Sequence, residues 1–86
     1  MKVNDMNKNF QKLVEKEKIS DEEFNLISEI IKVRLENRIT QNKLAKLTGI
    51  SQPNITRFEK NTHSASLSTT IKILDALGYR LKIVKK

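Results

Sequence analysis

The polar side chains of this 86-residue chain offer the chemistry of anion binding and little of the chemistry of catalysis. The chain has 17 Lys and Arg against 10 Asp and Glu, a single His and no Cys, for a formal net charge of +7. A lone imidazole, with no thiol and no paired carboxylates, gives neither an activated nucleophile nor a set of metal ligands. We therefore expect a protein that is not an enzyme and that needs no metal or cofactor.

The positive charge is confined to the part of the chain that follows residue 25. Residues 1–25 hold five Lys and six Asp or Glu, whereas residues 26–86 hold twelve Lys or Arg and four Asp or Glu. This asymmetry suits a polyanion-binding unit joined to a near-neutral segment, although a basic surface can also serve solubility alone. No apolar run is long enough to span a membrane and the N-terminus lacks the pattern of a secretory signal, so we expect a cytoplasmic protein.

The window Thr40–Lys60 has the spacing of two short helices that meet at a steep angle. Ala45 supplies the small side chain that such helices need at their contact, and Gly49 can take the positive φ of the bend. Apolar residues fall at the positions that lock both helices onto a domain: Leu44, Ile50, Ile55 and Phe58. Small, glycine and apolar residues rarely coincide at these offsets by chance. The window therefore predicts a helix-turn-helix.

Capping residues predict the helices around this window. Ser20 and Glu23 form a capping box that begins a helix over about residues 21–37. We expect its inner face to carry five apolar side chains: Phe24, Ile27, Ile30, Ile31 and Leu35. Thr40 and Ser51 cap the two helices of the motif, which should cover about 41–48 and 52–60.

A last helix should begin after Ser66 and stop at Gly78. Its inward side chains are expected to be Leu67, Ile71, Leu74 and Leu77. Beyond it, the alternating, β-rich run Tyr79–Lys85 predicts a strand that has no partner elsewhere in the sequence. We expect it to pair with the same segment of a second copy across a two-fold axis, the alternative being a frayed tail.

The N-terminal residues form a separate pattern. Apolar side chains at helical spacing predict an amphipathic helix near residues 6–18: Met6, Phe10, Leu13 and Val14. The expected fold class is thus all-α, a bundle of about five helices with a short C-terminal β-strand used for pairing between chains. We divide it into an amphipathic segment (1–19), a DNA-binding domain (20–78) and a dimerisation strand (79–86).

Residues 24–78 resemble the Cro/C1 (Xre-like) repressor family. The motifs that carry this resemblance are Thr40-Gln41, Leu44-Ala45, Thr48-Gly49-Ile50-Ser51-Gln52, Ile55, Arg57-Phe58-Glu59 and the Leu-Asp-Ala-Leu-Gly that ends at Gly78. The resemblance implies that the second helix of the motif lies in the DNA major groove, with its N-terminal part against the base edges.

Carried over position by position, the resemblance assigns base reading to Gln52, Pro53 and Arg57. Gln52 can form two hydrogen bonds with adenine and Arg57 two with guanine, whereas Pro53 departs from the polar residue often found there and offers only apolar contact. Gln41 matches a position that contacts phosphate. Further side chains are expected at the DNA, with solvated surface groups as the alternative: Lys43, Ser51, Asn54, Thr56, Asn61, Thr62 and His63.

Arg34 and Glu59 match a family pair that forms an internal salt bridge. The resemblance implies that this pair fixes the recognition helix to the helix over residues 21–37. We expect Glu59 to be structural, because a carboxylate that faced phosphates would be repelled.

The run from Gly78 to the C-terminus, Gly-Tyr-Arg-Leu-Lys-Ile-Val-Lys-Lys, resembles the HigA-type antitoxins of bacterial toxin–antitoxin operons. This resemblance implies a cognate toxin of the mRNA-cleaving RelE/HigB type and repression of the shared operon. The toxin is expected to bind the N-terminal segment, unless this stripe packs on its own domain as extra core. The toxin-contacting residues would be Met6, Phe10, Leu13, Val14 and Glu17.

A homodimer completes this interpretation. Paired through Tyr79, Leu81 and Ile83, two copies would present their recognition helices roughly 34 Å apart to a palindromic double-stranded DNA operator. The alternative function is a stand-alone repressor of a phage or mobile element, with no toxin partner. An RNA-binding module is disfavoured because the four aromatic residues are scattered and form no stacking platform.

Overall fold

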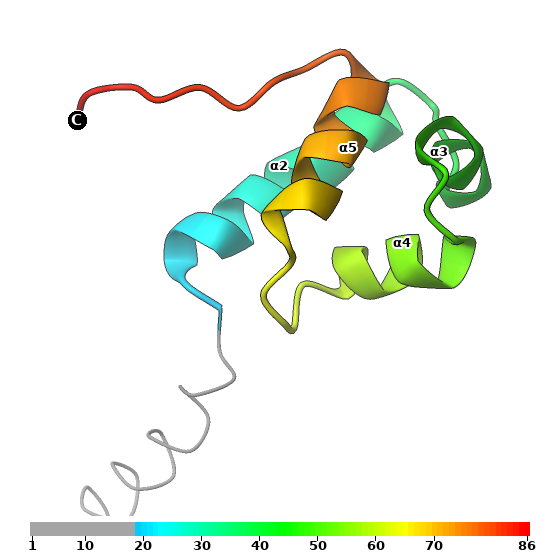
Figure 1. The fold of residues 1–86 in the computed structure, drawn as a ribbon, viewed down its shortest axis with the longest axis horizontal. Coiled ribbons are helices and arrows are strands. Elements are labelled where there is room, and N and C mark those ends of the chain that lie inside the picture. Colours follow the sequence, from blue (N-terminus) through cyan, green and yellow to red (C-terminus); the bar gives the residue numbers. More distant parts are fainter. Residues whose placement is uncertain (1–18) are drawn as a thin grey trace, which may run out of the picture.

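The computed structural model describes residues 19–86 and shows four helices joined by short loops (Figure 1). The helices are α2 (Asp21–Glu36), α3 (Gln41–Thr48), α4 (Gln52–Lys60) and α5 (Leu67–Leu77). The described residues contain no strand, so the all-helical class is confirmed for this part of the chain. The helix predicted near residues 6–18 lies outside the described residues.

Each helix begins where a Ser or Thr hydroxyl accepts a hydrogen bond from the backbone three residues later. The four capping residues are the predicted ones: Ser20, Thr40, Ser51 and Ser66. The capping distances from backbone N to side-chain oxygen lie between 3.0 and 3.4 Å. Such caps satisfy backbone N–H groups that have no partner within the helix, and this local chemistry explains why the helix starts were predictable.

The helix ends use the left-handed conformation at four places, one of which is Gly49 after α3. Gly78 ends α5 with φ +87°, and Asn61 ends α4 with φ +58°. After α2, Arg38 takes φ +57° and its backbone N–H bonds to Leu35 O at 3.0 Å. The chain thereby turns sharply into α3.

The core is built from apolar side chains that all four helices contribute. Its buried members are Ile27, Ile30, Leu44, Ile55, Phe58, Ile73 and Leu74. In the core, α3 and α4 contact each other, α5 packs on α3, and α2 contacts both α4 and α5. The two helices of the motif are therefore held by packing from both sides.

The predicted inner face of α2 is wrong at two positions. Phe24 is 50% exposed and Leu35 is 59% exposed, whereas Ile27 and Ile30 are buried as expected. The buried line continues from Ile30 to Arg34, because a charged side chain with internal partners takes the place that periodicity gave to Leu35. Periodicity alone does not anticipate a buried arginine.

The predicted inner face of α5 is also rotated from the observed one. Leu67 is 66% exposed and Ile71 is 44% exposed, while Ile73 is completely buried. Leu67 and Ile71 share one side of this helix and Ile73 lies on another, so apolar residues cover most of its circumference. Such a helix has two candidate inner faces, and only its neighbours decide between them.

The C-terminal residues 79–86 have no regular secondary structure; the segment begins beside α2 and α5, and its end extends away from the helices (Figure 1). Ile83 is 97% exposed and Val84 is 75% exposed. A strand requires a neighbouring strand to bond with, and residues 19–86 supply none, so the predicted strand is not present in this single chain. No helix of the described part is long and apolar enough to cross a membrane.

Candidate nucleic-acid interface

The bend between α3 and α4 has the local structure that the sequence predicted. Gly49 takes φ +76° and its N–H bonds to Ala45 O at 2.9 Å. Thr48 closes the bend, because its hydroxyl donates to Leu44 O at 2.8 Å and accepts from the N–H of Ile50 at 3.1 Å. The two short helices leave this bend at a steep angle to each other (Figure 1).

Helix α4 has one buried face and one open face. Ile55 and Phe58 lie in the core, whereas Pro53, Asn54 and Arg57 are exposed. Gln52 and Thr56 are half-buried on the side that faces α3. The buried face anchors α4 in the core, and the open face presents polar, apolar and cationic groups.

The stretch of chain that forms α3 and α4 has almost no negative charge. Between Asn37 and Leu74 the sequence contains one acidic residue, Glu59. Neither α3 nor α4 has an Asp or Glu in its first turn, so the positive ends of both helix dipoles are left without a neutralising side chain. With Lys43, Lys46 and Lys60 exposed nearby, this surface suits a polyanion.

The single acidic group of this region is paired with a cation inside the protein. Glu59 Oε2 accepts from Arg34 Nε at 2.6 Å and Glu59 Oε1 accepts from Arg34 Nη2 at 2.8 Å. Only 9% of the arginine side chain and 8% of the glutamate side chain are exposed. Arg34 Nη1 also donates to Ile39 O at 2.7 Å, so the expected pair joins α2, the α2–α3 loop and α4.

A chain of hydrogen bonds leads from this pair to the surface of α4. Gln41 Nε2 donates to Glu59 Oε1 at 2.9 Å. Gln41 Oε1 accepts from Thr56 Oγ1 at 2.7 Å and from Gln52 Nε2 at 3.1 Å. Gln52 Nε2 also donates to Thr56 Oγ1 at 2.9 Å, which closes a ring of three side chains. Sequence reasoning missed this ring, although the i, i+4 spacing of Gln52 and Thr56 places them on one face of α4.

Residues 30–84 match a protein-family model whose description is helix-turn-helix. This chain belongs to the Cro/C1-type helix-turn-helix family. The family match thus covers the bend, both motif helices and α5.

Several relatives of this Cro/C1-type chain carry names. It is 42% identical over 59 residues to an uncharacterized HTH-type transcriptional regulator of Haemophilus influenzae, covering 69% of this chain and 60% of that protein. It is 49% identical over 45 residues to antitoxin HipB of Escherichia coli, covering 52% of this chain and 48% of HipB. It is 32% identical over 65 residues to antitoxin HigA1 of Mycobacterium tuberculosis, covering 76% of this chain and 44% of HigA1. The chain therefore spans about half the length of these relatives.

A solved structure resembles the Cro/C1-type chain over most of its length. It is a toxin–antitoxin module from Streptococcus pneumoniae, and the match has a TM-score of 0.63 at 36% sequence identity. The match covers 88% of this chain and 80% of the other.

The other residues expected at DNA fall into two groups. Two of them have structural partners: the Ser51 hydroxyl caps α4, and Asn61 Nδ2 donates to Phe24 O at 3.0 Å. Four more are exposed, and among them Thr62 Oγ1 lies 3.1 Å from His63 Nδ1: Lys43, Asn54, Thr62 and His63. One shallow depression beside α4 brings Asn54, Arg57 and His63 together. Residues 19–86 contain no cluster of three or more His, Asp or Glu side chains that could hold a metal ion.

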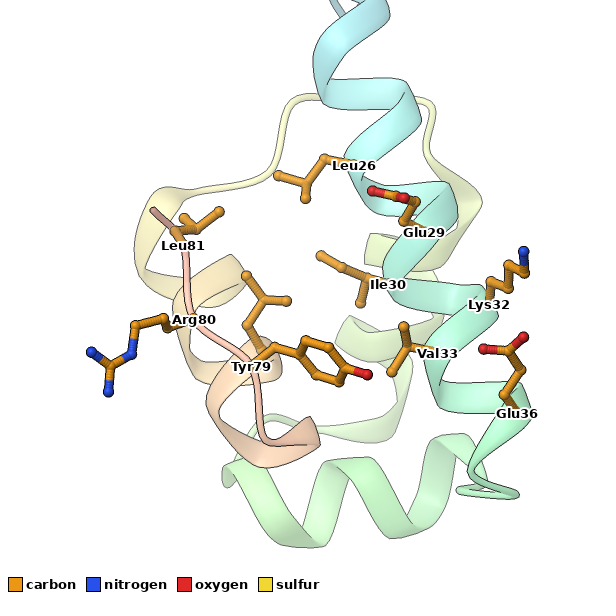
Figure 2. Close-up of a pocket in the computed structure, with 10 residues that line it drawn as sticks. Leu26, Glu29, Ile30, Lys32, Val33, Glu36, Tyr79, Arg80 and Leu81 are labelled. Atoms are coloured by element: carbon orange, nitrogen blue, oxygen red, sulfur yellow. The ribbon is translucent and has the colours of Figure 1, made fainter. Parts of the chain in front are cut away.

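A second surface of this Cro/C1-type chain is a groove between α2 and the C-terminal segment (Figure 2), with a volume of about 350 Å³. Its apolar lining comes from three elements: Leu26, Ile30, Val33, Leu74, Tyr79 and Leu81. Glu29, Lys32, Glu36 and Arg80 add charge around it. Of the residues predicted to pair between chains, Tyr79 and Leu81 line this groove and Ile83 points into solvent. The residues predicted to contact a toxin lie outside the described part of the chain.

Proposed function

We propose that this protein is the antitoxin of a bacterial type II toxin–antitoxin pair and that it represses its own operon by binding DNA through α4. The observation that carries this proposal is a basic helix-turn-helix whose one carboxylate is held inside by Arg34. The names of the HipB and HigA1 relatives and of the pneumococcal module support the antitoxin assignment.

In the proposed DNA complex, α4 enters the major groove with its open face toward the bases. Gln52 and Arg57 are the base readers, and Pro53 offers apolar contact to a thymine methyl group. Lys43 and the N-terminal N–H groups of α3 and α4 hold phosphates. Asn54, Thr62 and His63 are further candidates for phosphate contact, and their exposure beside α4 supports this.

We propose that the DNA-binding form is a homodimer joined through residues 79–85. The groove between α2 and the C-terminal segment and the exposed Ile83 and Val84 support this proposal, because they leave apolar surface uncovered on one side of the molecule. Pairing of the two C-terminal segments as strands would satisfy their backbone groups and cover these side chains. A two-fold dimer matches a palindromic operator.

The proposed toxin is a small RelE/HigB-like protein, and the N-terminal segment is its docking site. The near-neutral charge of residues 1–25 supports this assignment of toxin binding to the N-terminal segment, since a basic, RNA-binding toxin would not be repelled by it. Met6, Phe10, Leu13 and Val14 would enter its apolar groove, with Glu17 facing its cations.

A co-expression experiment tests the proposal. The chain carries an affinity tag and is expressed together with its neighbouring reading frame, and the purified material is titrated onto the DNA upstream of the pair. We expect a small basic protein to co-purify and the upstream DNA to be bound in preference to random DNA. The toxin assignment is wrong if nothing encoded by the neighbouring frame is retained.

The second candidate is a stand-alone repressor without a toxin. The name of the Haemophilus influenzae relative, a transcriptional regulator, favours it. The same experiment separates the two candidates, because a stand-alone repressor binds the upstream DNA and retains no partner.

A further inference from the structure

The ring formed by Gln41, Gln52 and Thr56 is connected to a group that can only accept hydrogen bonds. A carboxylate paired with an arginine has no proton to donate, so the atom that Gln41 turns toward Glu59 must be its N–H donor. The observed bond, Gln41 Nε2 to Glu59 Oε1 at 2.9 Å, has this direction. The reversed amide would place two acceptor oxygens against each other.

The direction of the first amide fixes the direction of the second. With Nε2 of Gln41 turned to Glu59, its Oε1 faces α4 and accepts from Gln52 Nε2 at 3.1 Å. The Thr56 hydroxyl donates its single proton to the same Gln41 oxygen at 2.7 Å. It therefore has only lone pairs to offer Gln52, and it accepts from Gln52 Nε2 at 2.9 Å.

The amide nitrogen of Gln52 is consequently turned inward, toward Gln41 Oε1 and Thr56 Oγ1. Gln52 Oε1 is the remaining polar atom, and no hydrogen bond to it is found among residues 19–86. If Gln52 Oε1 were buried, it would be a buried oxygen without a partner. Among residues 19–86 the one such side-chain atom is Asn61 Oδ1, so Gln52 Oε1 is accessible to solvent. Gln52 thus presents an acceptor to the surface that faces DNA in the proposed function.

We propose that Glu59, which is too deeply buried to touch DNA, is a positioning residue that sets the base preference of Gln52. Through Gln41 and Thr56 it holds the Gln52 carbonyl oxygen outward. The base opposite this oxygen must therefore bring an amino group, adenine N6 or cytosine N4, and guanine O6 and thymine O4 are repelled. This inference rests on the proposed function, since it concerns how α4 reads a base.

The test starts from selection of double-stranded DNA from a random library with the purified full chain. The base pair read by position 52 is the one whose preference disappears in the variant Gln52→Ala. The dissociation constant is then measured for four versions of the selected site that differ at this base. We expect wild-type protein to bind the adenine and cytosine versions roughly fivefold or more tightly than the guanine and thymine versions.

Two further variants test the role of Glu59. Glu59→Gln can offer either a donor or an acceptor to Gln41, so the preference for adenine and cytosine over guanine and thymine should fall toward one at this base pair and stay intact elsewhere. If this variant is unfolded by circular dichroism, Gln41→Leu interrupts the same chain and keeps the Arg34–Glu59 pair. Equal weakening on all four sites would make Glu59 a brace only and overturn the inference. Selection of no sequence by the wild-type chain would instead contradict the proposed function.

Discussion

The two sides of α2 serve different kinds of contact. Toward α3 and α4, Arg34 is buried and every hydrogen bond of the Arg34–Glu59 pair is made within one chain. Toward the C-terminal segment, the groove that includes Leu26 and Val33 is open and apolar. Polar groups that are hydrogen-bonded inside a chain need no other molecule. By contrast, the free energy of the system falls when another molecule covers exposed apolar surface. The first side is complete in a monomer and the second is not.

The largest expected effect comes from breaking the complete side. Arg34→Met leaves Glu59 buried without its cation, and we expect the free energy of unfolding to fall by about 3–5 kcal/mol. Urea denaturation followed by circular dichroism measures this loss. The double variant Arg34→Met with Glu59→Leu removes both charges and should regain much of the stability. Equal losses in the single and double variants would contradict the view that the cost lies in an unpaired buried charge.

A substitution in the C-terminal segment is expected to have a smaller effect on folding and a large effect on dimer assembly. Ile83→Asp changes a side chain that is 97% exposed, so the free energy of unfolding of the monomer should change by less than about 0.5 kcal/mol. Sedimentation should nevertheless show loss of the proposed dimer, and binding to the proposed operator should weaken roughly 100-fold because the two recognition helices would no longer act together.

Leu67→Asp is the matched control for that variant. Leu67 is also a highly exposed apolar residue, at 66%, but it is the first residue of α5 and not part of the C-terminal segment. We expect the proposed dimer to form normally in this variant. Loss of the dimer in both variants would show that any charge added to the exposed apolar surface has this effect, and the special role of the C-terminal segment would be wrong.

The smallest expected effect lies on the open face of α4. Arg57→Ala should cost ~1–3 kcal/mol of binding free energy on the operator and relax the preference at one base pair. Titration of operator and random DNA separates this outcome from its opposite. Equal weakening on both DNAs would make Arg57 a phosphate contact, as we expect for the comparison variant Lys43→Ala.

Features set by a few neighbouring residues were predictable from the sequence. The four capping residues and the turn at Gly49 depend on local hydrogen bonds and on one backbone angle, and the structure has each where it was expected. The bounds of α3 and α5 follow directly from these signals.

Features set by packing between helices were not predictable. Leu67 and Ile71 were expected inside because α5 has apolar residues on more than one side. Leu35 was expected inside because helical periodicity does not anticipate a buried Arg34, and Phe24 because it is an apolar residue in the first turns of α2. The ring of Gln41, Gln52 and Thr56 depends on how α3 crosses α4, which no spacing in the sequence encodes.

The uncovered groove also bears on how the protein would respond to its own abundance. In the proposed dimer, each copy covers apolar surface of the other, so the DNA-binding species forms when two copies of the chain associate. At low abundance its amount then rises with about the square of the chain concentration, by mass action. Repression of the operon would therefore behave as a threshold in protein supply, steeper than a monomer with the same α4 could give.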